Sequence, residues 1–349
     1  MLTLLEVVDF IVDAHLGGGI LLNALLFYIV RRFSKSSVGT YKNLLATFAA
    51  YDIFLSTLHL LTRPAAVITG TTFGVVTETR FEDRKLTSIY CACFTVPFAL
   101  MNIHFIYRFW SVRYPHLIAL FSSKKFIAFI SIWPLMEFIV WYHLCYYALT
   151  GDVDEIGTHI LRDEFARRYG VVLNDGWIVM NYWENDEFQP RPFISMVTFD
   201  VIIFASFTMA ITLGSLTFFI RTTDKLSAQA YHLQRTLFIA VCAQTFVPLV
   251  FVYIPYYCVI NFAFFNINLG FVDIAWMRMT ACFPAWDAVI IIAIIRDYRE
   301  GFLGMFRKKK VVTGGGTTWK TVSSMLLPSG VSGVSQVSQV PSVAVDEKA

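Results

Sequence analysis

Long apolar stretches separated by mostly short polar connections run through most of this chain. A helix needs about 20 mainly apolar residues to cross roughly 30 Å of hydrocarbon, because each residue adds about 1.5 Å. Seven stretches are long enough, and they lie near residues 8–30, 43–68, 88–112, 126–149, 193–220, 236–260 and 272–295. The pattern therefore predicts an all-α membrane protein with seven membrane-spanning helices within residues 1–300.

The composition agrees with a helical chain embedded in a lipid bilayer. Of the 349 residues, 56% are hydrophobic and only 15% are charged, and the mean hydropathy is +0.60. A soluble domain does not keep such a composition dissolved. The 33 phenylalanines and 11 prolines suit long helices, whereas the strands of a membrane barrel would alternate apolar and polar residues.

The distribution of Lys and Arg predicts which way the bundle faces. These residues gather in the first, third and fifth connections and in the tail, for example at Arg32, Lys124, Lys225 and Lys308. Because basic loops stay in the cytoplasm, we expect the N-terminus outside and the C-terminus inside. Arg108 then lies at the cytoplasmic end of the third helix. Receptors that couple to G proteins have this orientation, and the insect type of odorant-gated channel has the opposite one.

One long polar connection, residues 150–192, is expected to be an extracellular loop. Residues 156–169 keep the apolar spacing of a helix, and Gly170 is a stop signal. Asp175-Gly176 lies between two apolar runs, which predicts a β-hairpin. Such a hairpin would cover a pocket that opens outward.

The tail at residues 301–349 is rich in Ser, Gly and Val and ends in "SGVSGVSQVSQVPSVAVDEKA". It has too little apolar surface to form a packed core, so we expect a disordered cytoplasmic segment.

The six cysteines lie within or at the ends of the apolar stretches. Their spacing does not match a zinc site, so no metal is expected. The loop at residues 150–192 contains no cysteine, which means that it cannot be joined to the third helix by a disulfide. Cys91 or Cys93 could instead pair with Cys145, because all three lie near the outer ends of helices.

Three polar residues in different spans share one predicted depth. Asn23, Asp52 and Asp287 each lie eight to ten residues from the basic end of their helix, or roughly 12 to 15 Å along it. Ionisable groups inside a membrane are costly and usually face the interior of a bundle. We expect a buried cluster that shares a proton, holds water or binds a cation, unless each residue is satisfied separately by nearby backbone.

The outer halves of the spans supply candidates for a ligand pocket. A mostly aromatic cavity with few polar groups would suit a small, poorly charged ligand. The candidates are His59, Phe94, Tyr142, His143, Phe199, Asp200, Tyr253, Tyr256, Asp273, Trp276 and Arg278. Taken singly, each residue type is more often a packing or interface residue than a ligand contact.

Several classes of protein find no support in the chain. The histidines form no His-Glu-x-x-His pair, and "TGGGTTWK" lacks the Gly-Lys-Ser/Thr ending of a phosphate-binding loop. No lysine lies deep in a span, which argues against a retinal Schiff base. We therefore expect no enzyme, no cofactor and no nucleic-acid partner.

Four segments together resemble a known family. They are "GTYKNLLATFAAYDIFLS" at 39–56, "HFIYRFW" at 104–110, "QTFVPLVFVYIPYY" at 244–257 and "FPAWDAVIIIAIIRDYR" at 283–299. The chain resembles the nematode serpentine chemoreceptors, in particular the Str class (serpentine receptor class r) and the related Srj class. It departs from the family pattern at Phe109, where Tyr is more frequent, and at Ala288, where Pro is usual.

The resemblance implies a seven-helix chemosensory receptor in the plasma membrane, in the sensory cilia of chemosensory neurons. Its partners would be a small odorant or pheromone-like ligand and the Gα subunit of a heterotrimeric G protein. It names neither the ligand, the Gα class nor a dimer partner. The residues that match the family's third-helix and seventh-helix motifs are Tyr107, Arg108, Asp287, Arg296, Tyr298 and Arg299.

Two alternatives stay open at this point. The chain could be a seven-helix ligand-gated channel or transporter, although it lacks the internal repeats typical of transporters. Arg108 could be a simple anchor whose guanidinium reaches the membrane surface from an apolar helix end. Otherwise it rests against a carboxylate or carbonyl and turns to Gα on activation. Tyr107 precedes it, so the usual adjacent acid is absent.

Overall fold

The computed structural model describes residues 4–35, 38–78, 83–220, 228–267 and 278–307. Its long helices are α1 (Leu4–Phe33), α2 (Tyr41–Thr62), α3 (Arg84–Cys93), α4 (Val96–Arg113), α5 (Lys124–His143), α6 (Glu155–Tyr169), α7 (Pro190–Phe219), α8 (Ala228–Pro248), α9 (Ile254–Phe264), α11 (Phe283–Ile294) and α12 (Arg296–Phe306). Short helical turns are η2 (Pro115–Ser122), η3 (Leu144–Ala148), η4 (Gly151–Val153), η5 (Leu249–Tyr253) and η6 (Thr280–Cys282). The strands are β1 (Pro64–Thr69), β2 (Thr72–Thr77), β3 (Ile178–Asn181), β4 (Trp183–Glu184) and β5 (Glu187–Phe188).

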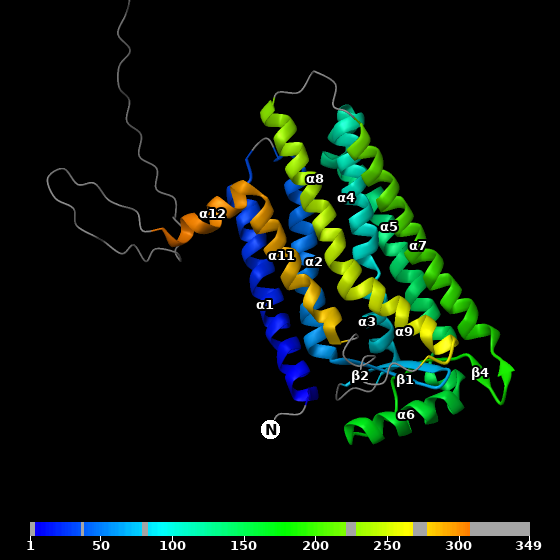
Figure 1. The fold of residues 1–349 in the computed structure, drawn as a ribbon. Helices are drawn as coiled ribbons and strands as arrows, with labels where there is room; N and C mark the ends of the chain where they lie inside the picture. The colour runs from blue at the N-terminus through cyan, green and yellow to red at the C-terminus, as the bar shows by residue number, and fades with distance from the viewer. Residues whose placement is uncertain (1–3, 36–37, 79–82, 221–227, 268–277, 308–349) are drawn as a thin grey trace, which may run out of the picture. The chain divides into compact units, whose positions relative to one another are not determined.

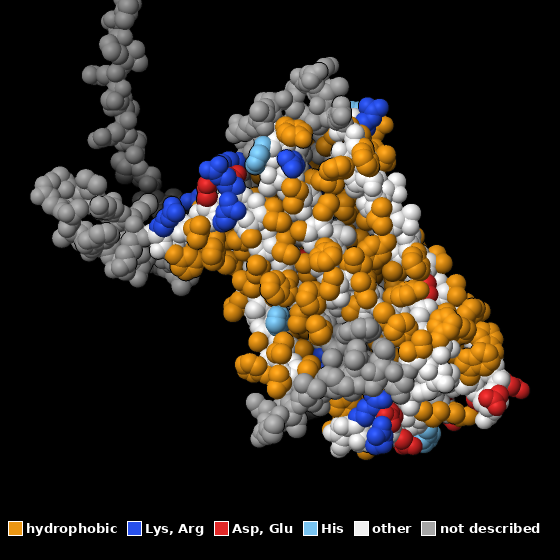
Figure 2. Space-filling view, viewed as in Figure 1, with side chains coloured by type: hydrophobic (Ala, Val, Ile, Leu, Met, Phe, Trp, Pro, Cys, Tyr) orange, Lys and Arg blue, Asp and Glu red, His pale blue; other side chains and the backbone are white. Residues whose placement is uncertain are grey.

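The apolar helices lie alongside one another in a bundle (Figure 1). Among the described residues, six helical segments are long and apolar enough to cross a membrane: Val7–Phe33, Tyr41–Thr62, Arg84–Arg113, Lys124–Ala148, Pro190–Phe219 and Tyr231–Phe264. A shorter apolar helix covers Thr280–Ile294. Figure 2 shows apolar side chains over the broad middle of one face and charged side chains concentrated at the two ends. The chain is therefore a multi-pass helical membrane protein, as predicted.

The second span ends earlier than predicted, and the seventh span is described only in part. The predicted span 43–68 is wrong at its end, because the helix stops at Thr62 and residues 64–69 form strand β1. Arg63 has a left-handed backbone (φ 41) that ends the helix, and Pro64 cannot donate the next helical hydrogen bond. Of the predicted span 272–295, residues 272–277 lie outside the described part of the chain.

A small antiparallel sheet closes one end of the bundle, which we call the sheet end. Strand β1 turns back into β2, with Thr69 opposite Thr72, and β2 pairs with β3, with Phe73 opposite Met180. The hairpin predicted around Asp175-Gly176 is therefore wrong. The apolar run after Gly176 pairs with a strand about a hundred residues earlier instead of with its own neighbour.

The two faces of the sheet contact different layers. Val67, Val76 and Val179 belong to a cluster with Leu161 and Phe165 of α6. The alternate residues of the strands belong to the main core of the bundle, and they include Ile68, Phe73, Val75, Ile178 and Met180. Side chains alternate between the faces of a strand, so the sheet lies between α6 and the bundle.

Helix α6 agrees with the prediction for residues 156–169. Asp154 caps its start, because the carboxylate accepts a hydrogen bond from the Gly157 amide at 2.7 Å. Gly170 ends it with a left-handed backbone (φ 70), a conformation that glycine adopts without steric cost.

Candidate functional site

Arg108 lies near the end of α4 that is opposite the sheet, which we call the arginine end. Its side chain is buried, with 2% of the residue exposed. The guanidinium carbon lies 3.5 Å from the ring centroid of Tyr41 in α2 and 5.1 Å from that of Tyr107. A snorkelling anchor would have an exposed head group, so this burial argues against the anchor alternative.

Gln234 supplies the polar partner of Arg108. Arg108 Nη1 donates to Gln234 Oε1 of α8 at 3.1 Å, and Ser111 donates to the same oxygen at 3.3 Å. Within the described residues, Arg108 forms no ion pair, and its Nε and Nη2 atoms have no hydrogen-bond partner. The Arg108 guanidinium thus contacts the ring of Tyr41 and the side-chain amide of Gln234. These contacts connect α2, α4 and α8.

The aromatic surroundings of Arg108 are themselves fixed by hydrogen bonds. Tyr41 is fully buried and lies 3.4 Å from His104 Nδ1 through its hydroxyl group. The Tyr107 hydroxyl lies 3.0 Å from that of Thr40 at the start of α2. A desolvated cation–π contact contributes about 2 kcal/mol, so Tyr41 is a stabilising partner for the buried charge.

The seventh-helix motif residues separate into two groups. Tyr298 is buried, with its hydroxyl 2.7 Å from Ser34 Oγ, and it lies within electrostatic range of Arg108. Arg296 is exposed and pairs with Glu300 at 2.7 Å. Arg299 donates to the Ala293 carbonyl at 2.8 Å. The structure thus brings Tyr298 toward Arg108, while Arg296 and Arg299 are engaged within their own segment.

Asn23, Asp52 and Asp287 come from α1, α2 and α11, and all three are buried. Asn23 Nδ2 donates to the carbonyls of Gly19 and Pro284, at 3.0 and 2.7 Å, and so connects α1 to α11. The two carboxyl groups lie close enough to interact electrostatically. Oxygen atoms of all three residues have no hydrogen-bond partner among the described residues. The arrangement therefore has unused capacity for a proton, a water or a cation.

Gly19 allows this close approach, and its neighbours provide a matched test. A Cβ atom at Gly19 would lie 2.8 Å from Ser56 Oγ and 3.5 Å from Pro284 Cβ, whereas Gly17 and Gly18 have nothing within 4 Å. We expect Gly19→Leu to destabilise the folded protein by about 1–3 kcal/mol through overpacking, and Gly17→Leu to have little effect. Thermal unfolding of the purified protein measures this. Equal losses in the two variants would show that the close contact is unimportant.

Three further buried or partly buried polar residues of this region were not predicted from the sequence. Tyr41 and Gln234 surround Arg108, and Asn102 in α4 is buried with neither amide atom hydrogen-bonded in the described structure. Asn102 had a usable signal, since an amide in the middle of an apolar span is rare. Tyr41 and Gln234 lie at span ends, where polar and aromatic residues are ordinary, and carried no such signal.

The predicted pocket residues fall into separate places at the sheet end. Phe94, Phe199 and Tyr253 join the main core, where Phe199 stacks on Trp141 with ring centroids 4.1 Å apart. Tyr142 packs against this core, and Asp200 accepts a hydrogen bond from Asn261 at 3.2 Å. Trp276 and Asp273 lie outside the described residues. The cavity that Phe94 lines has a volume of only about 10 Å³, which is room for one water at most.

His59 and Arg278 line a second cavity of about 60 Å³ between α1, α2 and the start of the seventh span. Arg278 pairs with Asp9 and lies 3.4 Å from Glu78, which follows β2. Burial raises the pKa of Glu78, and Arg63 opposes this shift. Acidic solution therefore neutralises Glu78 earlier than an exposed glutamate and weakens its attraction to Arg278.

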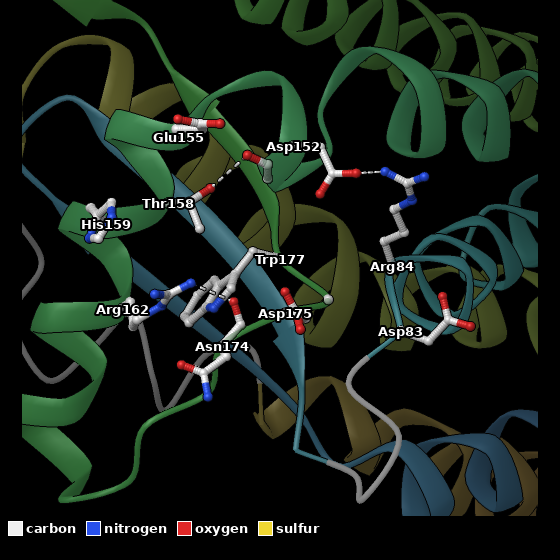
Figure 3. Close-up of a pocket in the computed structure, with 12 residues that line it drawn as sticks. Asp83, Arg84, Asp152, Glu155, Thr158, His159, Arg162, Asn174, Asp175 and Trp177 are labelled. Carbon is white, nitrogen blue, oxygen red and sulfur yellow. Dashed lines mark hydrogen bonds and ion pairs between the residues drawn. The ribbon is translucent and has the colours of Figure 1, made fainter.

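A larger polar pocket of about 540 Å³ lies on the sheet end beside α6 (Figure 3). Arg84, at the start of the third span, pairs with Asp152, which follows the fourth. Arg162 donates to the Asn174 carbonyl at 2.6 Å, and Trp177 lines the wall between them. The pocket therefore lies where the start of the third span and the residues after the fourth span meet helix α6 and the segment before β3.

A groove of about 540 Å³ lies at the arginine end, between α4, α7 and α8. Its lining residues are Val112, Thr217, Phe218, Ile220, Tyr231, Gln234, Arg235 and Phe238. Gln234 therefore both holds Arg108 and faces this groove. An apolar groove with a few polar groups is the kind of surface that receives an amphipathic helix.

Apolar helices packed in a bundle, with Asp52 and Asp287 buried inside it and Arg108 buried near one end, define a multi-pass helical membrane protein. Comparison with known proteins makes this specific. The family described as "Serpentine type 7TM GPCR chemoreceptor Str" matches residues 9–303. The chain belongs to this family of nematode-type serpentine receptors, as its motifs predicted, and the family is a receptor class and not a class of enzymes.

Individual relatives agree with this assignment. The chain is 28% identical over 310 residues to "Serpentine receptor class r-10" of Caenorhabditis briggsae, which covers 83% of this chain and 88% of the relative. It is 26% identical to the protein of the same name from Caenorhabditis elegans, with 82% and 87% covered. It is 24% identical to "G-protein coupled receptor str-217" of Caenorhabditis elegans, with 79% and 83% covered.

Proposed function

We propose that this chain is a chemosensory receptor that faces outward with its sheet end and activates a heterotrimeric G protein at its arginine end. The single observation that carries the proposal is the contact of Arg108 with Tyr41 and Gln234 beside a groove. Arg108 is a buried cation, and two of its nitrogen atoms have no hydrogen-bond partner among the described residues. It could therefore exchange Tyr41 and Gln234 for carbonyl or carboxylate groups of an entering Gα helix.

In the proposed cycle, the ligand and Gα both bind one form of the receptor more tightly than the other. A ligand at the sheet end would favour a form in which the inner ends of α4 and α8 separate, because only that form admits the Gα helix. Arg108 would then leave Gln234 and turn toward Gα. The polar cluster of Asn23, Asp52 and Asp287 lies between the two ends and would set the balance between the two forms.

Nucleotide exchange provides the direct test of coupling. Purified receptor in lipid nanodiscs is expected to accelerate GTPγS binding to purified Gα, and Arg108→Ala is expected to lower this acceleration at least tenfold at equal receptor concentration. Arg113→Ala, five residues further along α4, is the matched control for loss of a positive charge. An Arg108→Ala receptor that couples normally would remove Arg108 from the mechanism.

A seven-helix channel or transporter is the competing function. Ligand-dependent current that persists in cells lacking Gα would support the channel, whereas ligand-dependent exchange on purified Gα would support the receptor. A calcium-reporter screen with a panel of small odorants identifies the ligand needed for both measurements.

Two places compete for that ligand. The aromatic core beneath the sheet would suit a small, poorly charged ligand. Its cavity has a volume of only about 10 Å³, so the sheet and α6 would have to shift to admit the ligand. The polar pocket beside α6 would suit a charged, water-soluble ligand. Phe94→Leu should impair the response in the first case, and Arg162→Gln in the second. Arg167→Gln, an exposed charge on the same helix, is the control.

A further inference from the structure

Two cysteines from different spans meet beneath the sheet. Cys91 lies in α3, two residues before its end, and Cys145 lies in η3, at the end of the fourth span. Both belong to the main core and are buried, with 5% and 3% exposed. Both are free thiols in the structure and lie close enough to interact electrostatically, on segments that pack against each other. Two neighbouring thiols on packed segments can be joined by a disulfide when their Cβ atoms approach each other.

The helical geometry of the fourth span directs Cys145 toward the third span. Almost all of this span faces away from the bundle, but Trp141, Cys145 and Leu149 are buried at intervals of four residues. Residues Leu144–Ala148 form a π-helix, whose turn is wider than that of an α-helix. Residues four apart therefore stay nearly in line, and Cys145 faces inward.

Only one of the two cysteines in α3 faces Cys145. Residues two apart in an α-helix point about 200° apart, because each residue turns the helix by about 100°. Cys93 accordingly lies on the α2 side, where the Tyr51 hydroxyl donates to its carbonyl oxygen at 2.7 Å. Cys91 is left as the neighbour of Cys145.

We propose that Cys91 and Cys145 form a disulfide in the mature protein and so fix the third span to the fourth beneath the sheet. The proposal rests on the orientation proposed above, which exposes the sheet end to the oxidising lumen of the secretory pathway during synthesis. It supplies a clamp on the third span that the cysteine-free loop at 150–192 cannot provide.

The chemistry is thiol–disulfide exchange with a protein disulfide of the secretory pathway. One cysteine, as thiolate, attacks a sulfur of that disulfide and displaces the other sulfur as a thiolate. The second cysteine then attacks the mixed disulfide, forms the Cys91–Cys145 bond and releases the carrier with two thiols. Two electrons and two protons thus pass from the two cysteines to the carrier. The exchange takes place during folding, before the core excludes the carrier.

The bond would also stabilise the sheet and helix α6, which together cover this end of the bundle. Leu149, four residues after Cys145, accepts a hydrogen bond through its carbonyl from the Val179 amide of β3 at 2.6 Å. A fixed Cys145 therefore holds the end of the fourth span where β3 attaches. Loss of the bond should loosen β3 and α6 before it loosens the helices at the arginine end.

Peptide mapping tests the bond in the unmodified protein. Receptor from animal-cell membranes is denatured without reductant in N-ethylmaleimide, digested and analysed by mass spectrometry. We expect one linked peptide pair that contains Cys91 and Cys145, and alkylation of Cys93, Cys242, Cys258 and Cys282. Reductant should release the pair. Alkylation of both Cys91 and Cys145 without reductant would overturn the proposal.

Variants and a topology assay separate the possible failures. Cys91→Ser and Cys145→Ser should each abolish the linked pair and lower the thermal midpoint by several degrees, as should reductant on the wild type, whereas Cys93→Ser should keep the pair. Protease added to intact cells should cut within residues 150–192. If it does not, the proposed orientation fails; if it does and the thiols are free, only the disulfide fails.

Discussion

Replacing Tyr41 with leucine is expected to raise ligand-independent nucleotide exchange on Gα. The ring of Tyr41 lies 3.5 Å from the Arg108 guanidinium in the arrangement described here. Its loss would remove about 1–2 kcal/mol from that arrangement alone, which corresponds to a rise of about 5–30-fold in the competing active population. GTPγS binding to purified Gα, with receptor in nanodiscs and no ligand, measures the change.

Two further variants identify the interaction responsible. Tyr41→Phe keeps the aromatic face and loses only the hydroxyl group, which contacts His104, so its exchange rate should stay much closer to the wild type than that of Tyr41→Leu. Gln234→Leu removes the acceptor of Arg108 Nη1 at 3.1 Å and should also raise basal exchange, because a buried donor loses its partner. If Tyr41→Leu and Tyr41→Phe gave the same exchange rate at equal receptor concentration, the ring would have no part in holding Arg108.

Asp52→Asn and Asp287→Asn are expected to lower basal exchange several-fold while leaving the order of ligand potencies unchanged. An amide has nearly the shape of the carboxyl group but cannot ionise, share a proton or bind a cation, so each substitution fixes the contact between α2 and α11 in a neutral form. The helices should then favour the packed arrangement described here. Cell-surface labelling and concurrent exchange measurements follow the two effects separately.

The outcome that excludes this role is also specific. Equal loss of surface receptor in both Asn variants, with normal exchange by the receptor that remains, would make the two carboxyl groups structural. Asp297→Asn is a suitable control, because this carboxylate lies outside the cluster and pairs with Lys35 at 2.5 Å.

The order of residues along the chain is enough to predict the membrane class, the approximate spans and the family. These properties are local, since apolar length fixes a span and short motifs identify the family. It also selected Asn23, Asp52 and Asp287, because equal distances from helix ends place residues at equal depths. The structure places these three side chains in one region of the interior.

Which side chains contact one another depends on the packing of the helices and strands. Arg108 and Gln234 are separated by 126 residues, and β2 pairs with β3 across a similar distance. The hairpin predicted at Asp175-Gly176 does not form. Strand β3 pairs with β2 instead, because this gives it a partner strand and apolar contacts on both faces. Which of Cys91 and Cys93 faces Cys145 likewise depends on how α3 is rotated against its neighbours. Rotation and pairing arise from packing between elements, which a linear pattern of apolar and polar residues does not specify.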